Sequence, residues 1–314
     1  MEFSHVPVLP AESVRALNIK PDGVYVDGTL GGGGHSALIL QNLTPQGRLI
    51  GIDRDENAVA AASERLRAYK NFLPIHGNFH DMPEILAEQN IPAVDGVLLD
   101  LGISSYQIDT PERGFSFRHD GPLDMRMDKT HSVTARDIVN ECEEKRLAYI
   151  FFTYGEERNS RRIARAICEA RKAASIETTV QLSAIIERTS PPYHGAGLHP
   201  ATRSFMALRI AVNNELEPLE GVLRNIVPFL SPSAGESGGR FAVITFHSLE
   251  DRIVKKTFAS LENPCLCPRD IPYCVCGKVQ ELKVITRKPI IPSPEEILLN
   301  RRAHSAKLRV AERL

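Results

Sequence analysis

The residues that point most directly to chemistry form a glycine-rich loop, DGTLGGGGHS, at residues 27–36. The loop follows the apolar run VYV, which predicts a strand, and lies before an expected helix. Glycines let a backbone turn sharply and approach a ligand, because no Cβ intervenes. The free N–H groups and the partial positive charge at a helix start favour an anion. The loop therefore predicts a site for a pyrophosphate or a carboxylate.

Two common phosphate-binding loops do not fit the spacing of these glycines. A dinucleotide-binding loop reads G-x-G-x-x-G; counted from Gly31 the third glycine would fall at Ser36, and counted from Gly28 the second would fall at Leu30. A Walker A loop needs a Gly-Lys-Ser/Thr sequence, and no lysine follows these glycines. A tight surface turn without any ligand stays open as the alternative.

Acidic residues end three of the expected strands. Asp27 follows VYV, Asp53 follows RLIGI, and Asp100 follows VDGVLL. The carboxyl ends of parallel strands share one edge of an open α/β sheet, where ligands bind, although a single strand-end aspartate is often only a cap. Asp53 would accept hydrogen bonds from a ribose diol. A ribose without pyrophosphate, with a carboxylate at the helix start, describes S-adenosylmethionine. Phe79 could stack on the adenine, and a core position suits it equally well.

The elements that must position these residues read as alternating strands and helices over residues 21–100. The apolar runs at residues 24–26, 48–52 and 94–99 are short and continuous, as in parallel strands buried on both faces. Between the second and third runs, apolar residues recur every three or four positions, which predicts an amphipathic helix. They are Val59, Ala62, Leu66 and Tyr69. We therefore expect an α/β fold built on a doubly wound sheet.

A helical insert is expected to interrupt this sheet at residues 109–199, where no convincing strand is found and the helices are polar. After it, apolar residues step by three and four from Phe205 to Ile226, which predicts one long helix kinked at Pro218. The run FAVITF at residues 241–246 predicts a returning strand. Residues 1–108 and 200–314 would then form one discontinuous domain.

Basic residues gather in two places although the whole chain is nearly neutral. Lys and Arg number 38 against 39 Asp and Glu, which excludes a strongly basic coat but not local patches. Residues 278–314 carry nine Lys/Arg and four Glu, a net of about +5 by the same counting. RNA phosphates could be held there or by the insert residues Arg161, Arg162, Arg165, Arg171 and Lys172. A solvated helix face paired with glutamates explains the insert residues equally well.

The composition predicts a cytoplasmic protein. No run of about 18 apolar residues is found, so no membrane span is expected, and the first residues lack the pattern of a signal peptide. Six cysteines without an export signal suggest reduced thiols. Four of them, Cys265, Cys267, Cys274 and Cys276, are close enough in sequence to suggest zinc. Their C-x-C spacing is tighter than usual, so free thiols stay open and no metal is assigned.

Taken together, these motifs resemble the bacterial 16S rRNA cytosine-N4-methyltransferase family, formerly the MraW family, over nearly the whole chain. The resemblance rests on HVPVL (5–9), the glycine loop, DLGISS (100–105), RGFSF (113–117) and GPLDMRMD (121–128). It extends through YGEER (154–158), HPATR (199–203) and FHSLEDR (246–252). One departure is NRRAHS at residues 300–305, where the family usually has NPRARS, so the contacts of this segment are less certain.

The resemblance implies a class I, Rossmann-like methyltransferase with an inserted helical domain that recognises RNA. It implies that S-adenosylmethionine contacts Gly33, Gly34, His35, Asp53, Phe79, Asp100 and Gln107. The implied substrate is the cytidine C1402 of 16S rRNA, in the small ribosomal subunit or a late assembly intermediate, with no DNA and no membrane as partner. Whether the protein forms a homodimer stays open.

The reaction needs the poorly nucleophilic cytosine amine in line with the sulfonium methyl group. DNA amino-methyltransferases use Asp/Asn/Ser-Pro-Pro-Tyr/Phe after the same strand, whereas this chain has Leu-Gly after Asp100. The residues that could face the base are Ser104, Ser105, Tyr106 and His247, and Asp100 itself is a further candidate. No general base is identified. A DNA or small-molecule methyltransferase, or an assembly factor that binds RNA without turnover, stays as an alternative.

Overall fold

A computed structural model describes residues 7–190, 198–233, 235, 237–268 and 273–314. The side chains of Ser105 and Tyr106 are outside this description, as are His5 and Val6 of the HVPVL motif. The chain divides into two compact units. One unit combines Met1–Gly102 with Leu216–Leu314, and the other is Ile103–Glu215.

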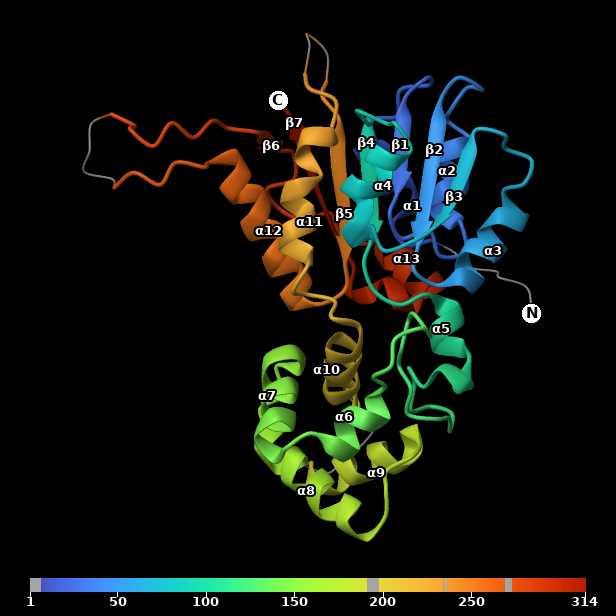
Figure 1. The fold of residues 1–314 in the computed structure, drawn as a ribbon, viewed down its shortest axis with the longest axis vertical. Helices are drawn as coiled ribbons and strands as arrows, with labels where there is room; N and C mark the ends of the chain where they lie inside the picture. The colour runs from blue at the N-terminus through green and yellow to red at the C-terminus, as the bar shows by residue number, and fades with distance from the viewer. Residues whose placement is uncertain (1–6, 191–197, 234, 236, 269–272) are drawn as a thin grey trace. The chain divides into compact units, whose positions relative to one another are not determined.

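A seven-stranded sheet in the order β3-β2-β1-β4-β5-β7-β6 forms the first unit (Figure 1). The strands β1 to β5 are parallel, and β7 is antiparallel to both β5 and β6. Because the chain moves outward from β1 to β3 and then returns to β4, the order reverses between β1 and β4. Ligands bind beside such a reversal in open α/β sheets. The strand bounds are β1 (Val24–Asp27), β2 (Arg48–Asp53), β3 (Phe72–His76), β4 (Gly96–Asp100), β5 (Arg240–Thr245), β6 (Leu282–Val284) and β7 (Lys307–Arg313).

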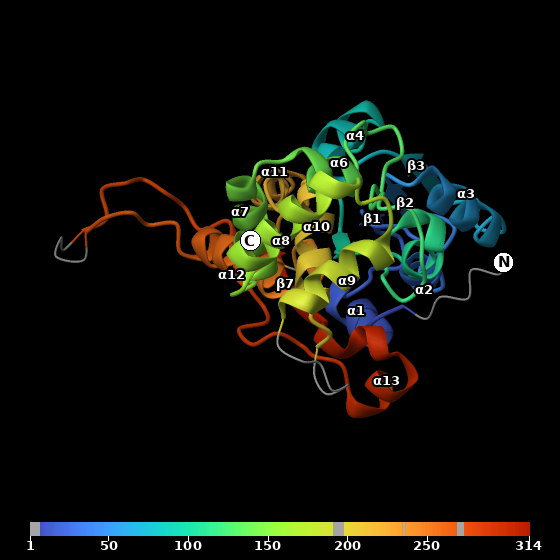
Figure 2. The ribbon, with the colours of Figure 1, turned by 90° about the horizontal axis from the view of Figure 1, so that it is seen from below.

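Helices cover both faces of this sheet (Figure 2). Val97 and Leu99 of β4 pack into the core on one face, while Leu98 between them packs into the core on the other, and all three are fully buried. This explains why the strands read as continuous apolar runs. The first face carries α4 (Met82–Glu88), α11 (Leu219–Asn225) and α12 (Ser248–Glu262). The second carries α1 (Pro10–Leu17), α2 (Gly34–Leu40) and α3 (Glu56–Arg65).

The second unit is helical, and its described residues form no strand. Capping boxes start two of its helices: Thr134 pairs with Asp137, and Thr178 pairs with Gln181. It contains α5 (Ser105–Asp109), α6 (Ala135–Glu141), α7 (Glu144–Gly155), α8 (Ser160–Ala173), α9 (Thr179–Thr189) and α10 (Thr202–Asn213). Its bounds are wider than the 109–199 expected from sequence, because α10 packs against α7 and shares its apolar core.

The single kinked helix expected from Phe205 to Ile226 is wrong. The chain forms α10 and α11 as separate helices, and α10 ends at Asn214, whose φ of 47° lies in the left-handed region. Leu208 of α10 belongs to the core of the helical unit, whereas Leu223 of α11 belongs to the core of the sheet. The three-and-four spacing continues across the break, so periodicity alone could not reveal it.

Residues 278–314 were expected to form a basic segment, and they instead complete the sheet. β7 lies between β5 and β6, with Leu308 and Val310 buried. Arg309 is also buried. Its charge is paired there, since its Nε lies 2.6 Å from Asp251 Oδ1 of α12. This charged residue interrupts the apolar pattern of the strand. The segment also includes α13 (Pro294–Leu299) and the 3₁₀ helix η4 (Arg301–Ser305).

The basic residues of α8 are partly used within the helical unit. Arg171 donates to the carbonyl of Val139 at 2.7 Å, and Lys172 lies 2.7 Å from Glu169. Arg165 lies 3.6 Å from a glutamate of α7. Arg161 and Arg162 are exposed. Among the described residues, no helix is long and apolar enough to cross a membrane.

Candidate active site at the carboxyl edge of the sheet

The glycine loop between β1 and α2 is tied to both neighbouring strands. The amide of Leu30 donates to the carbonyl of Ile52 at 2.9 Å, and the amide of Gly28 donates to the carbonyl of Leu98 at 2.9 Å. Thr29 Oγ1 accepts the amide of Asp100 at 2.6 Å. These bonds fix the loop against the ends of β2 and β4.

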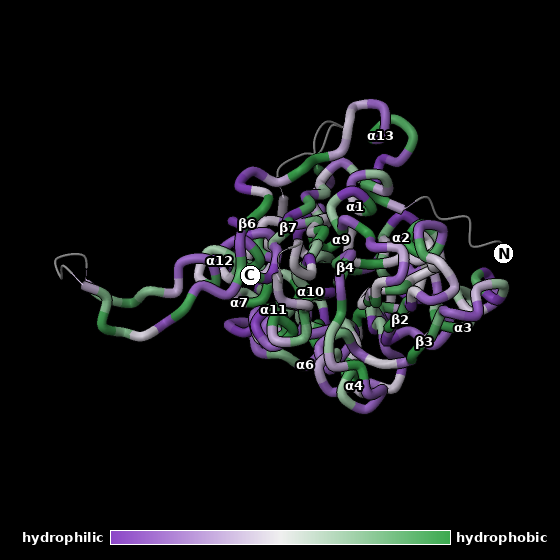
Figure 3. Tube along the Cα trace, turned by 90° about the horizontal axis from the view of Figure 1, so that it is seen from above, coloured by the Kyte–Doolittle hydropathy of each residue, from purple (hydrophilic) through white to green (hydrophobic). Residues whose placement is uncertain are grey.

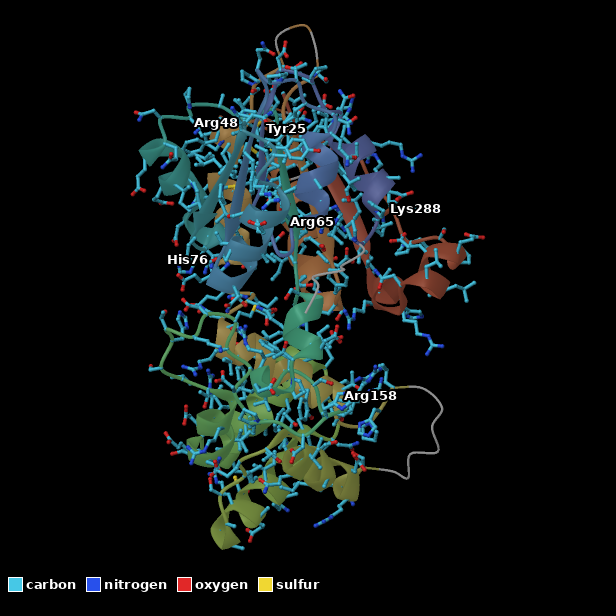
Figure 4. All side chains as sticks on the ribbon, turned by 90° about the vertical axis from the view of Figure 1, so that its right-hand side faces the viewer. Tyr25, Arg48, Arg65, His76, Arg158 and Lys288 are labelled. Carbon is cyan, nitrogen blue, oxygen red and sulfur yellow. The ribbon has the colours of Figure 1, made fainter. Side chains whose placement is uncertain are left out.

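Two glycines in this loop adopt conformations that other residues rarely reach. Gly31 has a φ of 48° and Gly33 a φ of 72°, both in the left-handed region. At Gly28 the reason is space, because an added Cβ would lie 2.5 Å from Leu99 Cδ2. Arg65, labelled in Figure 4, reaches the loop from α3 and donates to the carbonyl of Gly32 at 3.0 Å.

Asp53, at the end of β2, holds the loop with its carboxylate. Oδ2 accepts the amide of Gly31 at 2.7 Å, and Oδ1 accepts the amide of Asp55 at 2.9 Å. Burial raises the pKa of Asp53, and these two amides oppose that rise. Each carboxylate oxygen has a second lone pair. The side chain can therefore still accept hydrogen bonds from a hydroxyl pair.

A buried charged cluster lies beside the loop. His35, in the first turn of α2, has Nε2 3.4 Å from Asp100 Oδ2 at the end of β4. Burial alone would lower the pKa of His35, but the carboxylates of Asp100 and Asp27 outweigh it and raise the pKa. Asp27 is itself held by Ser36, whose hydroxyl donates to Oδ2 at 2.7 Å. Burial raises the pKa of Asp27 as well.

Two buried polar atoms of this cluster have no hydrogen-bond partner in the described structure. They are Asp100 Oδ1 and His35 Nδ1. The other ring nitrogen, His35 Nε2, has only the 3.4 Å ion-pair contact with Asp100 Oδ2. Unpaired buried polar groups cost about 1–3 kcal/mol each, and a polar ligand at this edge could supply the missing partners.

Phe79 and His80 follow β3 in the 3₁₀ helix η1 (Phe79–Asp81). Phe79 is half-buried and lies near the glycine loop, since a Cβ on Gly28 would come 3.3 Å from Phe79 Cβ. The two rings make an edge contact with centroids 4.2 Å apart. Burial, and then the charge of Arg54, lowers the pKa of His80 to about 4. Sequence reasoning did not single out His80, whose Nε2 is buried without a hydrogen-bond partner in the described structure.

At the end of β5, His247 caps α12. Its Nδ1 accepts the amide of Glu250 at 3.4 Å, and its Nε2 lies 3.0 Å from Glu250 Oε1. Glu250 Oε2 also accepts the amide of Phe246 at 2.9 Å. This buried glutamate was missed in the sequence, although the H-S-L-E spacing is that of a capping box. His247, expected as a candidate for contact with the base, is thus also the N-cap of α12.

A pocket of about 300 Å³ opens at the same end of β5, in the first unit. Its position is one strand away from Asp100, because Ile244 of β5 pairs with Asp100 of β4. Its volume is at the lower end for small-ligand pockets. Among its lining residues are Phe246, His247, Ser248, Ile291, Pro292, Ile297, His304 and Lys307.

Four of the expected site residues belong to the helical unit. Ser104 and Gln107 bond to one another: each backbone amide donates to the other side chain at 3.2 Å. Gln107 is buried. Ser105 and Tyr106 lie in α5, and their side chains are outside the description. The sheet unit thus contains the loop glycines together with His35, Asp53, Phe79 and Asp100. Gln107 belongs to the helical unit.

Comparison with known proteins shows the family to which the chain belongs. The profile of the MraW methylase family matches residues 2–314. Proteins named ribosomal RNA small subunit methyltransferase H are 53% identical in Carboxydothermus hydrogenoformans, over 100% of this chain and 99% of that protein, and 51% identical in Clostridium botulinum strain Loch Maree, over 100% of both. A putative methyltransferase from Streptococcus mutans, solved in complex with SAH, aligns at 12% identity over 97% and 98% of the chains with a TM-score of 0.39. The sequence match over its full length shows that this chain belongs to the MraW methylase family.

Proposed function

We propose that this protein methylates the exocyclic N4 of the decoding-region cytidine C1402 in 16S rRNA of the small ribosomal subunit. The full-length match to proteins named ribosomal RNA small subunit methyltransferase H carries the proposal. These relatives support methyl transfer to ribosomal RNA of the small subunit, and the choice of the N4 atom of one cytidine rests on the family resemblance of the sequence motifs. The cytoplasm, where ribosomal subunits are assembled, is the compartment that this substrate implies.

S-adenosylmethionine fits the residues at the carboxyl edge of the sheet. Its ribose diol suits the free lone pairs of Asp53, and its adenine suits the half-buried ring of Phe79. Its ammonium and carboxylate groups suit the unpartnered atoms of Asp100 and His35. The proposed cofactor residues are Gly33, Gly34, His35, Asp53, Phe79, Asp100 and Gln107. Gly33 and Gly34 belong to the loop predicted from the residues themselves, whereas Phe79, His35 and Gln107 rest mainly on the family resemblance.

When bound, the cofactor supplies an electrophilic methyl group on a sulfonium. The chain must align the target amine with that group and shield both from water. We assign the base to the pocket at the end of β5, because it is concave and lies one strand from Asp100. Phe246 offers an apolar surface there, and Lys307 a donor. Ser104, Ser105, Tyr106 and His247 stay as candidates for contact with the amine.

The helical unit is the proposed RNA-recognition domain. Arg161 and Arg162 of α8 are exposed and suited to phosphates, whereas Arg165, Arg171 and Lys172 make contacts within the unit. A net charge of −1 does not favour tight electrostatic binding to bare nucleic acid. We therefore propose that the substrate is the folded subunit or a late assembly intermediate, in which the base is unpaired.

Methyl transfer to defined substrates tests this function. Tritiated S-adenosylmethionine is incubated with small ribosomal subunits, a late assembly intermediate, naked 16S rRNA and DNA, and the product nucleoside is identified by mass spectrometry. We expect N4-methylcytidine from the ribosomal particles, far above the amount from naked RNA or DNA. A preference for DNA, equal activity on short naked RNA, or a methyl group on carbon 5 would refute the proposal.

A further inference from the structure

An arm of the chain, residues 263–281, leaves the sheet unit between α12 and β6 (Figure 1). Its base is clamped to the fold. The amide of Glu281 donates to the carbonyl of Leu261 at 3.1 Å, and the amide of Val284 donates to Glu262 Oε1 at 2.9 Å. Beyond this base, the described residues of the arm form no helix or strand.

The described residues in the outer part of the arm form no apolar core. Their large apolar side chains face outward: Leu266 is 73% exposed, Tyr273 80%, Val275 77% and Val279 76%. Figure 3 shows green, hydrophobic stretches along the projecting tube. A chain segment that buries so little cannot offset the entropy of ordering its backbone. Some other interaction must stabilise whatever structure the arm has.

Four thiols converge within this exposed arm. Cys265 and Cys267 on its outgoing side meet Cys274 and Cys276 on its returning side, and all four Sγ atoms lie within 4.8 Å of one another. The individual Sγ–Sγ distances are 3.6 Å (265–274), 3.8 Å (267–274), 3.4 Å (274–276) and 3.9 Å (265–276). Hydrophobic burial does not explain this convergence, because the surrounding side chains point into solvent.

The distances match a tetrahedron of thiolates around a metal ion. A zinc–sulfur bond of about 2.3 Å gives a sulfur–sulfur edge of about 3.8 Å in a regular tetrahedron. The four measured edges lie on either side of that value. A disulfide would need a separation of about 2.05 Å. The sulfurs are therefore arranged as ligands and not as bonded pairs.

A backbone amide is directed at one of these sulfurs. The amide of Val275 donates to Cys267 Sγ at 3.3 Å. Such an N–H donor stabilises negative charge on sulfur, as the outer contacts of metal ligands do. Because of the C-x-C spacing, Cys265 and Cys267 lie on one side of the arm and Cys274 and Cys276 on the other. Two ligands from each side then make up the four sulfurs of the cluster.

We propose that Cys265, Cys267, Cys274 and Cys276 bind one zinc ion that holds the arm together. Four thiolates in a tetrahedron favour zinc and leave no open coordination position, so the ion is structural and takes no part in catalysis. It replaces the apolar core that the arm lacks. The inference is independent of the methyl-transfer function, because the arm carries none of the proposed cofactor residues.

Metal analysis of the full chain, purified without chelator or affinity metal, tests the site. We expect about one equivalent of zinc per chain. Cys267→Ser and Cys276→Ser should each lose nearly all of it, whereas Cys142→Ser and Cys168→Ser, which change cysteines outside the arm, should keep it. Since the arm lies outside the apolar cores of the two units, the arm variants should keep the circular dichroism spectrum of the parent. Cobalt added to chelator-treated protein should give the visible and near-ultraviolet bands of a tetrahedral thiolate.

Limited proteolysis distinguishes a structural ion from a loosely bound one. Removing the metal should increase cleavage within the arm at least several-fold, while cleavage of the rest of the chain is unchanged. Protein that contains no zinc and takes up neither zinc nor cobalt would overturn the proposal. So would iron in place of zinc, disulfides detected by intact mass, or equal metal loss from the Cys142→Ser control.

Discussion

Asp53→Asn is the sharpest test of the cofactor site, because the substitution changes charge and hydrogen bonding while keeping the shape of the side chain. In the parent, one carboxylate oxygen accepts the amide of Gly31 at 2.7 Å and the other accepts the amide of Asp55 at 2.9 Å. In the variant, one of these amides faces an NH2 group, and the ribose diol loses a charged acceptor.

The magnitude follows from the bonds that change. Hydrogen bonds to a charged group contribute about 1.5–3 kcal/mol. At about 1.4 kcal/mol for each tenfold change, S-adenosylmethionine should bind about 10- to 150-fold more weakly. The unpaired amide at the loop should separately lower the free energy of unfolding by about 1–3 kcal/mol. The first effect concerns the complex, and the second concerns the protein without ligand.

Isothermal titration calorimetry on folded protein measures the affinity, and urea denaturation measures the stability. The matched control is Asp55→Asn, two residues away. Asp55 caps α3 through a bond from the amide of Asn57 at 3.1 Å, and asparagine caps a helix about as well as aspartate. The control should therefore change both quantities little. Unchanged affinity in folded Asp53→Asn, or an equal loss in Asp55→Asn, would remove Asp53 from the site.

Three further predictions concern stability. The pKa of His80 is about 4 in the folded protein and 6.5 in its ordinary state, so the unfolded chain binds more protons between these pH values. The free energy of unfolding should therefore fall as the pH is lowered from 6.5 to 4. His80→Gln should flatten that part of a urea-denaturation pH profile, and an unchanged slope would contradict the assignment. Arg309→Met should lower the free energy of unfolding by about 1.5–3 kcal/mol, because Asp251 loses its buried partner and keeps only Lys307 at 3.2 Å. The double variant with Asp251→Leu should recover part of this loss, and additive losses in a double-mutant cycle would argue against the pair. Gly28→Ala should lower the free energy of unfolding by about 1–3 kcal/mol, because the added methyl group would overlap Leu99. The control Gly221→Ala in α11, where nothing lies within 4 Å of the added Cβ, should raise the free energy of unfolding by about 0.5–1 kcal/mol. Equal melting temperatures of the two variants would refute the packing argument.

The sequence alone predicted the sheet and the acids at its edge. Strands buried on both faces must be apolar throughout, so VYV, RLIGI and VLL are visible in any single sequence. Because parallel strands end at one edge, Asp53 and Asp100 could be placed together without coordinates. The unusual glycine loop and the phrases around it then sufficed to suggest the family.

Tertiary structure decided where the helices end and what the C-terminal segment does. The apolar spacing of residues 205–226 continues through Asn214, and only the packing of Leu208 and Leu223 into different cores separates α10 from α11. β7 was hidden because Arg309 looks like a surface residue until Asp251, 58 positions earlier, is seen beside it. A charge is tolerated inside a sheet only when its partner is close, and sequence does not show that distance.

The details of the site depended on structure for the same reason. His35 rested mainly on the family resemblance, and its contact with Asp100 joins residues 65 positions apart in the chain. His80 and Glu250 gain their properties from burial, which depends on every neighbouring element. The four cysteines were visible as a cluster, but the sulfur–sulfur distances that favour a metal over free thiols exist only once the arm folds back on itself. Sequence shows which groups are present, and folding sets the distances between them.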